Sequence, residues 1–203
     1  MKVALIGASG TLGVRVLDEL LNRGHEVTAI ARNIGPIPSR PNVIPRQADA
    51  GDPDALTPVL RGHDAIVTAI PFLGFPTEAF VAAVKASGVR RILVSGTSGS
   101  LEVEPGVQLI ATRLVSEHGK AEHLDSRELY KLLRRQDALD WTYLAPAALL
   151  TPGRRTGEFR LGNDQLIRGK LGESRISMED LAIVIVDELE NPQNVRRRFT
   201  AAY

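Results

Sequence analysis

A glycine-rich turn near the amino terminus constrains this chain more than any other feature of its sequence. The run Gly7–Gly13 (GASGTLG) follows a short apolar segment, Lys2–Ile6, and precedes a helical pattern of leucines and valines. Gly7 permits a tight turn, Gly10 lets backbone amides approach a pyrophosphate, and Gly13 lets the helix pack close to the strand. The helix amino terminus offers free N–H groups and a partial positive charge to the phosphates. The sequence therefore predicts that a dinucleotide binds at this turn.

Other groups of the same turn extend the predicted contact. Ser9 and Thr11 offer hydroxyl donors, and Leu12 lies in the first turn of the helix. The glycine spacing is G-x-x-G-x-x-G, and the run lacks the Lys-Ser/Thr pair that a P-loop requires, which argues against hydrolysis of a nucleoside triphosphate. A tight turn without a ligand is the alternative, but the strand before the run and the helix after it favour dinucleotide binding.

The rest of the chain alternates between patterns typical of strands and of helices. Ala65–Ile70 is a continuous apolar run, as in a parallel strand covered on both faces. Asp52-Pro53 begins a helix, because aspartate caps free amides and proline suits the first helical position. Further strands are expected at Glu26–Ala31, Val43–Gln47, Arg91–Ser95 and Trp141–Leu144, and further helices at Thr77–Ser87 and Lys120–Arg135. This order predicts an α/β fold with a Rossmann-type, doubly wound parallel sheet.

The alternation breaks down beyond Pro146, where residues 146–176 are predicted to form a small substrate-side elaboration. Two apolar patches, Phe159–Leu161 and Gln165–Ile167, suggest a hairpin within Pro152–Gly172. Ser177-Met178-Glu179-Asp180 has the form of a capping box and starts a helix to about Glu190. A last strand is expected at Arg197–Tyr203. Since no linker or repeat divides the chain, we expect residues 1–203 to form one NAD(P)-binding domain.

The end of the second predicted strand bears on which dinucleotide binds. An NAD site usually has Asp or Glu there, about 20 residues beyond the glycines, to bind the ribose 2′-hydroxyl. This chain has Arg32 instead, and a guanidinium suits a 2′-phosphate. NADP(H) is therefore the predicted cofactor; the alternative is that Arg32 is only a surface residue. Asp49 and Ala50 lie where such folds contact the adenine, although Asp49 could equally cap the next helix.

Composition argues against several other classes of protein. The net charge of +1 gives no general attraction to nucleic acid or to an anionic membrane. The chain has no cysteine, which excludes disulfides and thiol catalysis and agrees with a reducing compartment. The first apolar run is too short for a secretory signal, and no segment approaches the roughly 20 apolar residues of a spanning helix. We expect a cytoplasmic protein without a nucleic-acid or membrane partner, and the sequence leaves its oligomeric state open.

Several motifs along the chain belong to one pattern. They are GASGTLG, the IARN end of the second strand, Asp49, Ser95-Gly96, the segment Trp141–Pro146 (WTYLAP) and the RIS-MEDLA segment near residue 177. In these motifs, which extend over nearly the whole chain, the sequence resembles the atypical short-chain dehydrogenases of the NAD(P)H-binding, NmrA-like and biliverdin-reductase-B-like branch. The resemblance implies a Rossmann sheet, NADP(H) binding, and either reductase activity or redox sensing without turnover.

Two departures from that family pattern bear on the chemistry. Short-chain dehydrogenases with the usual active site carry Tyr-x-x-x-Lys, in which the tyrosine donates a proton. None of Tyr130, Tyr143 and Tyr203 has a lysine four residues on, so that pair is not supported here. Many relatives have Arg-Pro after the sixth strand, where this chain has Ala145-Pro146, and a charge near the cofactor is thereby lost.

Ligands of an open parallel sheet bind at the carboxyl ends of its strands. This rule places Ala69, Ile70 and Pro71 beside the cofactor, together with Ser95 and Gly96 of the next strand. All five are predicted cofactor contacts. Trp141 and Tyr143, which lie within a strand, are expected to be core residues.

The substrate side is less sharply defined by the sequence. Phe72, Leu73 and Phe75 are predicted to form an apolar wall over the nicotinamide, although the two phenylalanines could instead only pack their own loop. Ser95, Thr97 and Ser98 are candidates for orienting a carbonyl, unless they only form hydrogen bonds within the turn. Tyr130 is interpreted as a residue of the helix core or of a groove, with a substrate contact as the alternative. Further along, His118 and His123 are interpreted as exposed histidines, with a role as proton donor as the alternative, because histidine titrates near neutrality. Of the two we select His123 as the catalytic candidate. Their five-residue spacing without a third ligand predicts no metal site.

Three functions follow from these residues, and we rank them. The first is an NADPH-dependent oxidoreductase that transfers hydride to a small carbonyl, quinone or flavin-like acceptor, since the cofactor carries the difficult chemistry. The second is a non-catalytic nicotinamide sensor, favoured by the missing tyrosine–lysine pair. The third, a sugar-nucleotide epimerase, is disfavoured because the chain is short and lacks that pair.

Overall fold

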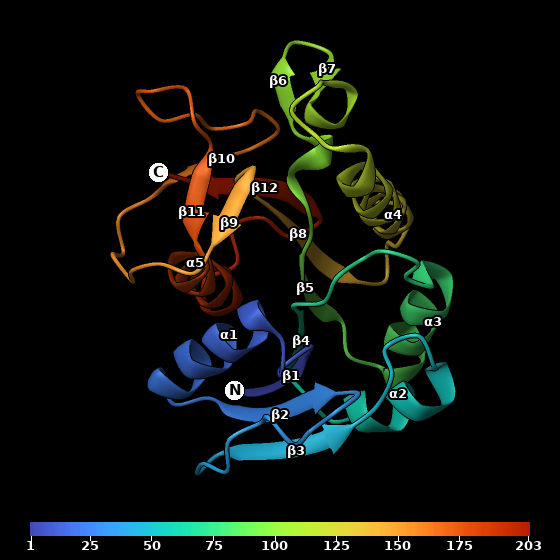
Figure 1. The fold of residues 1–203 in the computed structure, drawn as a ribbon. Coiled ribbons are helices and arrows are strands. Elements are labelled where there is room, and N and C mark those ends of the chain that lie inside the picture. The colour runs from blue at the N-terminus through green and yellow to red at the C-terminus, as the bar shows by residue number, and fades with distance from the viewer.

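The computed structural model describes residues 1–203, apart from the side chain of His118. A sheet of eight strands runs through it in the order β10-β12-β8-β5-β4-β1-β2-β3 (Figure 1). Neighbouring strands pair in parallel, except that β10 pairs antiparallel with β12. The predicted Rossmann-type parallel sheet is confirmed. Its strands are β1 (Lys2–Ile6), β2 (Glu26–Ala31), β3 (Val43–Gln47), β4 (Ala65–Thr68), β5 (Arg91–Ser95), β8 (Asp140–Pro146), β10 (Arg160–Gly162) and β12 (Arg197–Ala202).

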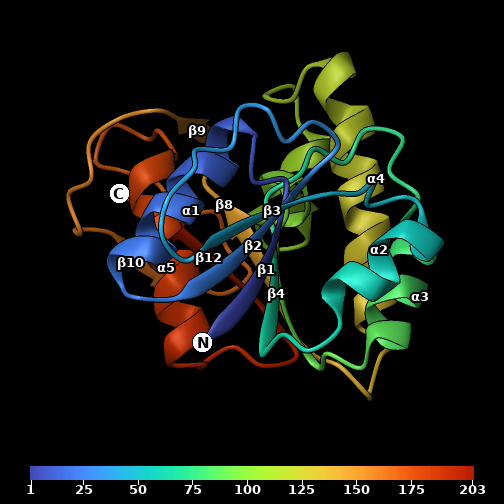
Figure 2. The same cartoon turned by 90° about the horizontal axis from the view of Figure 1, so that it is seen from below.

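Helices cover both faces of the sheet, as the view from below shows (Figure 2). Helices α1 and α5 pack against each other on one face, whereas α2, α3 and α4 lie on the other. A three-layer arrangement of this kind follows from strands that are apolar on both sides. The helices are α1 (Thr11–Asn22), α2 (Pro53–Leu60), α3 (Thr77–Ser87), α4 (Glu117–Leu133) and α5 (Met178–Glu190).

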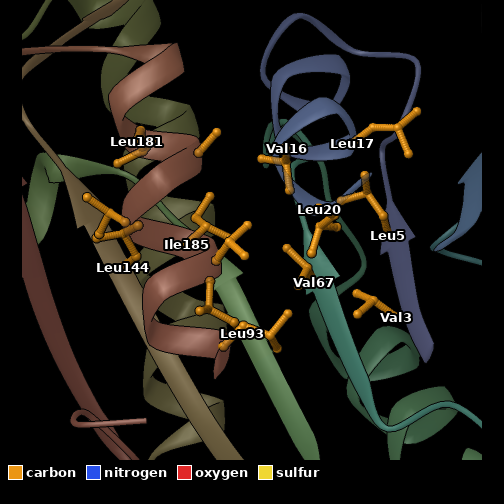
Figure 3. Packing of buried hydrophobic residues seen from close by; sticks show 14 of the residues in the cluster. Val3, Leu5, Val16, Leu17, Leu20, Val67, Leu93, Leu144, Leu181 and Ile185 are labelled. Carbon is orange, nitrogen blue, oxygen red and sulfur yellow. The ribbon is translucent and has the colours of Figure 1, made fainter. Parts of the chain in front are cut away.

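The sheet separates two hydrophobic clusters, one under each helical layer. Figure 3 shows the first, in which Leu17 and Leu20 of α1, Ile185 of α5, and Val67 and Leu93 of the sheet belong to one cluster. Each of these five side chains has no exposed surface. Burial of a leucine or isoleucine side chain is worth about 2–3 kcal/mol, so the two clusters are the main source of stability for the frame that positions the site.

Capping and helix-end residues in the sequence correctly predicted where several elements begin or end. Asp52 caps α2, because its Oδ1 accepts the N–H groups of Asp54 and Ala55 at 3.0 and 3.1 Å. Gly88 ends α3 in the left-handed region, with a φ of 80°. Other bounds differ from those expected. Strand β4 ends at Thr68 and not at Ile70. Helix α4 begins at Glu117 and not at Lys120, because the Ser116 hydroxyl caps it by accepting the Gly119 N–H at 3.1 Å.

The hairpin predicted within residues 152–172 is wrong. Its first apolar patch contributes β10, which pairs with β12 so that Arg160 lies opposite Ala202. The second patch forms a parallel bridge between Gln165 and Glu102. Each patch therefore finds a partner far away along the chain, which no local pattern indicates.

Short elements that the sequence did not reveal surround the carboxyl ends of the strands. Strands β6 (Glu102–Glu104) and β7 (Val107–Gln108) form a small antiparallel pair after β5. Strands β9 (Leu149–Thr151) and β11 (Arg175–Ser177) form a parallel pair after β8. Both pairs are too short for a recognisable period. They lie over the edge of the sheet where ligands of this fold bind.

Half of the predicted capping box is present at the start of α5. The Ser177 hydroxyl accepts the Asp180 N–H at 3.0 Å, as a cap should. The Asp180 carboxylate does not return to the Ser177 N–H, which instead donates to the Tyr203 hydroxyl at 3.1 Å. Asp180 accepts hydrogen bonds from Thr156, Gly157 and Tyr203 at 2.6–2.9 Å. A residue of the expected cap thus holds the loop around residue 156 in place.

A search of the described helices for a membrane-crossing segment, one both long enough and apolar enough, finds no candidate.

Candidate functional site

The glycine turn between β1 and α1 is a close-packed backbone structure, which we call the glycine cradle (Gly7–Gly13). Gly7 has a φ of 87°, and a Cβ there would lie 2.4 Å from the Ala69 carbonyl oxygen. A Cβ on Gly13 would lie 1.9 Å from the Gly7 carbonyl oxygen. Since real carbon–oxygen contacts are never this short, no larger residue fits at either position without moving the backbone.

Gly10 plays a different part in the glycine cradle. It is the N-cap of α1, in extended backbone, and no side chain caps the helix there. A Cβ on Gly10 would have its nearest neighbour at 3.3 Å, so packing alone does not demand glycine. The first N–H groups of α1, at Thr11, Leu12 and Gly13, have no intrahelical acceptor because of their position. They point out of the helix where an anion is favoured.

The chain after β4 lies against the glycine cradle. The Ala69 N–H donates to the Ile6 carbonyl at 2.9 Å, and the Ile70 side chain reaches to 2.8 Å from the position of a Gly7 Cβ. Ala69 and Ile70 are half-buried and Pro71 is exposed. Three of the predicted cofactor contacts are thus brought beside the cradle. Ser9, also predicted, is half-buried within it.

Arg32 and Asp49 lie at the carboxyl ends of the neighbouring strands β2 and β3. Arg32 is exposed, and within the described part of the chain its guanidinium forms no ion pair. Asp49 Oδ1 accepts the Gly51 N–H at 2.8 Å in a local turn. The alternative in which Asp49 caps the next helix is wrong, because Asp52 does so. Ala50 is half-buried against the core, and the adenine contact of this pair stays a prediction.

The predicted Ser/Thr cluster follows β5 and packs against Tyr143. Ser95 is 4% exposed at the end of the strand. A Cβ on Gly96 would lie 2.0 Å from the Tyr143 ring, which explains glycine at that position. The Thr97 N–H donates to the Tyr143 hydroxyl at 3.2 Å. Thr97 itself is half-buried, next to the turn Ser98–Ser100.

Tyr143 is a core residue, as expected for a strand position. Its side chain has no exposed surface, and its hydroxyl lies 2.6 Å from the Ser126 hydroxyl. Burial raises the pKa of the Tyr143 phenol, and hydrogen bonds with Ser126 and Thr97 oppose that shift only in part. A buried phenol with a raised pKa gives up its proton less readily, so Tyr143 does not stand in for the missing tyrosine–lysine pair.

A cavity of about 420 Å³ opens beyond the carboxyl ends of β5 and β8, and we call it the acceptor cavity. Ser98 contributes from the β5 side and His123 from α4. Six lining residues come from the segment 146–176, which the sequence predicted to be the substrate-side elaboration. Those six are Ala148, Leu166, Arg168, Gly172, Glu173 and Ser174. The cavity combines apolar walls with hydroxyl, imidazole and charged groups, as small-molecule sites do.

His123 is the predicted catalytic residue that lines this cavity. Its ring packs on the backbone of the turn after β5, where a Cβ on Gly99 would lie 2.6 Å from the His123 Cγ. The Nδ1 atom is fully buried and has no hydrogen-bond partner among the described residues. Burial lowers the pKa of His123, and the nearby charge of Glu122 opposes this in part. The other candidate histidine, His118, has its side chain outside the described residues.

The aromatic wall predicted from Phe72 and Phe75 is not presented to solvent. Phe72 is 1% exposed, and its ring meets that of Phe75 edge-on at 5.9 Å. Phe75 in turn meets Phe80 at 5.3 Å. The three rings form an edge-to-face cluster between the loop and α3, a geometry that aromatic pairs prefer. The loop-packing alternative therefore describes Phe72, and Phe75 is half-buried.

Tyr130 also lies away from the acceptor cavity. Its ring is 4.9 Å from that of Tyr143 and 6.0 Å from that of Trp141, near the start of β8. It lines a separate hollow toward the amino ends of the strands. The interpretation of Tyr130 as a core or groove residue therefore describes its position. The alternative of a substrate contact at the cofactor edge does not, since the periodicity of a helix predicts the face of a residue but not its height above the sheet.

The sequence did not identify Arg168, Glu173 and Ser174 as site residues. They come from a segment without periodicity, and only its return to the edge of the sheet brings them near His123. The one signal in the sequence that could have indicated them is that the segment after the last expected strand–helix crossover is rich in charged and hydroxyl residues. Among the described residues, no group of three or more His, Asp or Glu lies close enough to hold a metal ion.

Comparisons with known proteins match these features. Residues 7–192 match a protein-family model described as NAD(P)H-binding. A Burkholderia pseudomallei structure, provisionally described as an exported protein, is 40% identical with a TM-score of 0.90, and covers 100% of both chains. A Bacteroides thetaiotaomicron structure, provisionally an epimerase, is 38% identical with a TM-score of 0.95, and covers 100% of this chain and 96% of that one. A Streptococcus pneumoniae structure, provisionally an NADH-flavin reductase, is 29% identical with a TM-score of 0.86, and covers 100% and 99%.

Proposed function

The chain belongs to the NAD(P)H-binding family, and on that premise we propose that it is an NADPH-dependent oxidoreductase that reduces a small carbonyl, quinone or flavin-like acceptor. One observation carries the proposal: the glycine cradle and the acceptor cavity open at the same, carboxyl-terminal edge of the parallel sheet. In such sheets this edge is where cofactor and substrate meet. The similarity to the Streptococcus pneumoniae protein described as an NADH-flavin reductase supports this reaction class.

The residues of the glycine cradle fit a dinucleotide. A pyrophosphate needs close approach to backbone N–H groups, and the positive φ of Gly7 and the bare Cα of Gly10 leave that approach open. Thr11 and Ser9 add hydroxyl donors on either side of Gly10. When bound, the nicotinamide supplies a hydride. Ala69, Ile70 and Gly96 provide the floor on which we place the nicotinamide half.

We assign the choice of NADPH over NADH to Arg32. Its guanidinium is exposed beyond β2 and has no carboxylate partner in the described chain, so it is free to bind a 2′-phosphate. Paired charge-assisted hydrogen bonds from one arginine to one phosphate are among the strongest polar contacts in proteins. The position holds no acid, and an NAD-type contact to the 2′-hydroxyl is therefore missing.

We infer that His123 orients the acceptor as a neutral hydrogen-bond donor. Its Nδ1 is buried without a partner, and an unpaired buried N–H costs more than an unpaired lone pair. The proton of the neutral ring therefore resides on Nε2, on the side of the ring away from that buried atom. An Nε2–H group in the acceptor cavity can donate to a carbonyl, quinone or flavin oxygen, with Ser98 as a second donor.

The lowered pKa of His123 agrees with this assignment. Burial keeps the imidazole neutral at pH 7, so it holds a proton at Nε2 without carrying a charge. The proton that completes the reduction then comes from water. A quinone or flavin does not need that proton during hydride transfer, because its reduced anion shares the charge over a conjugated ring, whereas a simple ketone would leave a strongly basic alkoxide. This favours quinones and flavins as acceptors over simple ketones.

The experiment that tests the function follows NADPH absorbance with a panel of quinones, flavins and aldehydes. Oxidation of NADPH by at least one class, abolished when the cradle is disrupted by Gly10→Val, is the expected result. His123→Leu should lower kcat/KM about tenfold or more, as removal of an orienting donor does. His123→Gln should retain part of the wild-type kcat/KM, because the glutamine amide can still donate a hydrogen bond. Rates equal to the uncatalysed background with every acceptor would refute the proposal.

A redox sensor without turnover is the second candidate, and one observation favours it. Neither Tyr143 nor Tyr130 is placed to donate a proton at the cofactor edge: Tyr143 is buried in the core, and Tyr130 lines a hollow toward the amino ends of the strands. A sensor must bind NADP+ and NADPH with different affinity. Equal dissociation constants for the two forms, measured by calorimetry, would argue against it. The same missing donor disfavours an epimerase, despite the similarity to the Bacteroides thetaiotaomicron protein.

We further propose that the protein acts in the cytoplasm on small molecules, without a nucleic-acid or membrane partner. The net charge of +1 and the absence of cysteine support this placement. The similar Burkholderia pseudomallei protein is provisionally described as exported, which favours a location outside the cytoplasm. Cell fractionation with a tagged copy of this chain would decide between the two locations.

A further inference from the structure

A second hollow, of about 510 Å³, lies between the end of α4 and the first residues of β8 and β12. We call it the arginine hollow, and the side chains that matter in it are Tyr130, Arg134, Asp137, Trp141 and Arg197. Trp141 is the second residue of β8 and Arg197 the first of β12, and these strands are parallel. The arginine hollow is therefore near the amino ends of the strands, opposite the glycine cradle.

Two further arginines of this region are used to build its walls. Arg196 donates to the carbonyl oxygens of Leu139 and Asp137, at 3.3 and 2.5 Å, and so holds the turn between α4 and β8. Arg198 donates to the Ser100 carbonyl and to Asp164 at 2.9 Å each. Because these guanidiniums have acceptors, they shape the arginine hollow without offering free charge to it.

Arg134 and Arg197 have no such partners. Both are exposed, and neither guanidinium forms an ion pair within the described part of the chain. Arg134 only lies over the face of Tyr130, with 5.9 Å between its guanidinium carbon and the ring centre. The one lining carboxylate not engaged by an arginine is that of Asp137. A surplus of positive charge therefore remains in the arginine hollow.

The indole of Trp141 adds a further donor to the arginine hollow. Trp141 lines the hollow, and its N–H donates to no acceptor in the described residues. The N–H is not among the fully buried polar atoms without a partner, so it keeps accessible surface from which it can donate to a ligand. The Tyr130 hydroxyl, on the same wall, also lacks a hydrogen-bond partner in the described chain. Donors without acceptors thus converge on a space that two unpaired guanidiniums border.

We propose that the arginine hollow binds a phosphate-bearing small molecule about the size of a mononucleotide. Guanidinium groups match phosphate oxygens in geometry and charge, and the indole N–H supplies a further donor. The volume of about 510 Å³ accommodates such a molecule. Binding here leaves the glycine cradle free for its own ligand.

The sequence supplies a direct probe, because Trp141 is the only tryptophan of the chain. Its fluorescence is followed while inorganic phosphate, pyrophosphate or AMP is added to protein saturated with NADP+, which occupies the cradle. Calorimetry under the same conditions gives the dissociation constant. We expect pyrophosphate or AMP to bind with a dissociation constant below about 1 mM. A preference for AMP identifies a nucleotide, whereas equal affinity identifies the phosphate group as the feature recognised.

Variants decide whether the arginine hollow is the site. Arg134→Gln with Arg197→Gln should weaken binding about tenfold for each arginine, since each removes a charge-assisted hydrogen bond. Asp137→Asn should strengthen it. The matched control, Arg61→Gln with Arg154→Gln, removes two exposed arginines elsewhere and should leave the affinity unchanged. An equal loss of affinity in the control variant would overturn the proposal. So would the absence of both a heat signal and a fluorescence change with pyrophosphate and with AMP.

Discussion

The glycine cradle and the segment 146–176 both border the carboxyl-terminal edge of the sheet, but they are held in place in opposite ways. Backbone atoms in direct contact build the cradle, as at Gly13, where a Cβ would meet the Gly7 carbonyl at 1.9 Å. Side chains of distant helices hold the segment: Asp180 accepts the Thr156 and Gly157 N–H groups at 2.7 and 2.9 Å, and Arg155 bonds Glu19 at 2.9 Å.

This difference separates cofactor binding from acceptor recognition. A backbone cradle has one shape, which suits a ligand part common to all dinucleotides. The loop around residue 156 can be altered without disturbing the sheet, because its side-chain contacts are to Asp180 of α5 and Glu19 of α1, whereas β10 is the part of the segment that pairs with the sheet. We therefore expect changes in the cradle to affect folding and cofactor together, and changes at the loop to affect the acceptor cavity and local stability.

The largest effect is expected from substitution in the cradle. Gly13→Ala places a methyl group where no space exists, and should lower the free energy of unfolding by about 3 kcal/mol or more and abolish cofactor binding. Gly10→Ala has 3.3 Å to its nearest neighbour, so it should retain stability while it weakens the cofactor. Thermal unfolding and calorimetry with NADP+ measure both. Equal stability of Gly13→Ala and Gly10→Ala would contradict the view that backbone packing requires glycine at position 13 but not at position 10.

The next effect concerns the anchor of the loop. Burial works to raise the pKa of Asp180, but hydrogen bonds from Thr156, Tyr203 and Gly157 outweigh it and hold the pKa below its ordinary value of 3.8. This carboxylate therefore stabilises the fold above that value, and its contribution is lost as the pH falls through the lower folded-state pKa. Asp180→Asn should cost about 2 kcal/mol at pH 7 and much less in acid.

Chemical denaturation at neutral and acid pH measures the Asp180 effect. The control is Asp187→Asn, an exposed acid on the same helix, which should change little. Cofactor affinity should be unchanged in Asp180→Asn, because the cradle does not depend on this loop. A large loss of NADP+ binding would show that the two regions are coupled.

Arg32→Ala should have a smaller effect, confined to one ligand. Loss of its contact to a 2′-phosphate should weaken NADPH roughly tenfold or more and leave NADH almost unchanged. Dissociation constants from fluorescence titration of both cofactors provide the measurement, with Arg61→Ala as an exposed-arginine control. Equal losses of affinity for NADPH and NADH would show that Arg32 is only a surface residue and does not bind the 2′-phosphate.

The smallest effect is expected from pH at the acceptor cavity. Because burial depresses the pKa of His123 below its ordinary 6.5, the ring is neutral above that value in both folded and unfolded states. Activity should be independent of pH between about 7 and 8, and stability should decline as the pH falls below the ordinary histidine range. A rate that rises on acidification, and loses this rise in His123→Gln, would instead identify His123 as the proton donor.

Short-range signals explain which parts of the molecule were predictable. The cradle, the Asp52 cap and the Gly88 helix end each depend on residues within a few positions of one another, and the parallel order follows from their alternation. The position of Arg32 was predictable for the same reason, because it depends only on where β2 ends. These features could be read because backbone geometry limits the residue types that each position accepts.

The acceptor side could not be read in the same way. Glu102 and Gln165 form a bridge across the chain, and the hollow around Tyr130 exists only where α4 ends beside β12. Phe72 shows the other source of error: a residue after a strand can point toward the ligand edge or back into the core, and a single sequence does not distinguish the two. Its burial follows from Phe75 and Phe80, which complete an aromatic cluster.

The outer strand β3 has a consequence for the behaviour of the protein at high concentration. Pro45 lies in the middle of this strand, which forms one border of the sheet opposite β10. Since proline has no N–H to donate, a further strand cannot add along that border with a complete hydrogen-bond ladder. Arg46 beside it adds charge that repels a second copy. The open side of the sheet is thereby guarded against edge-to-edge aggregation, and self-association through continuous sheet formation is blocked there.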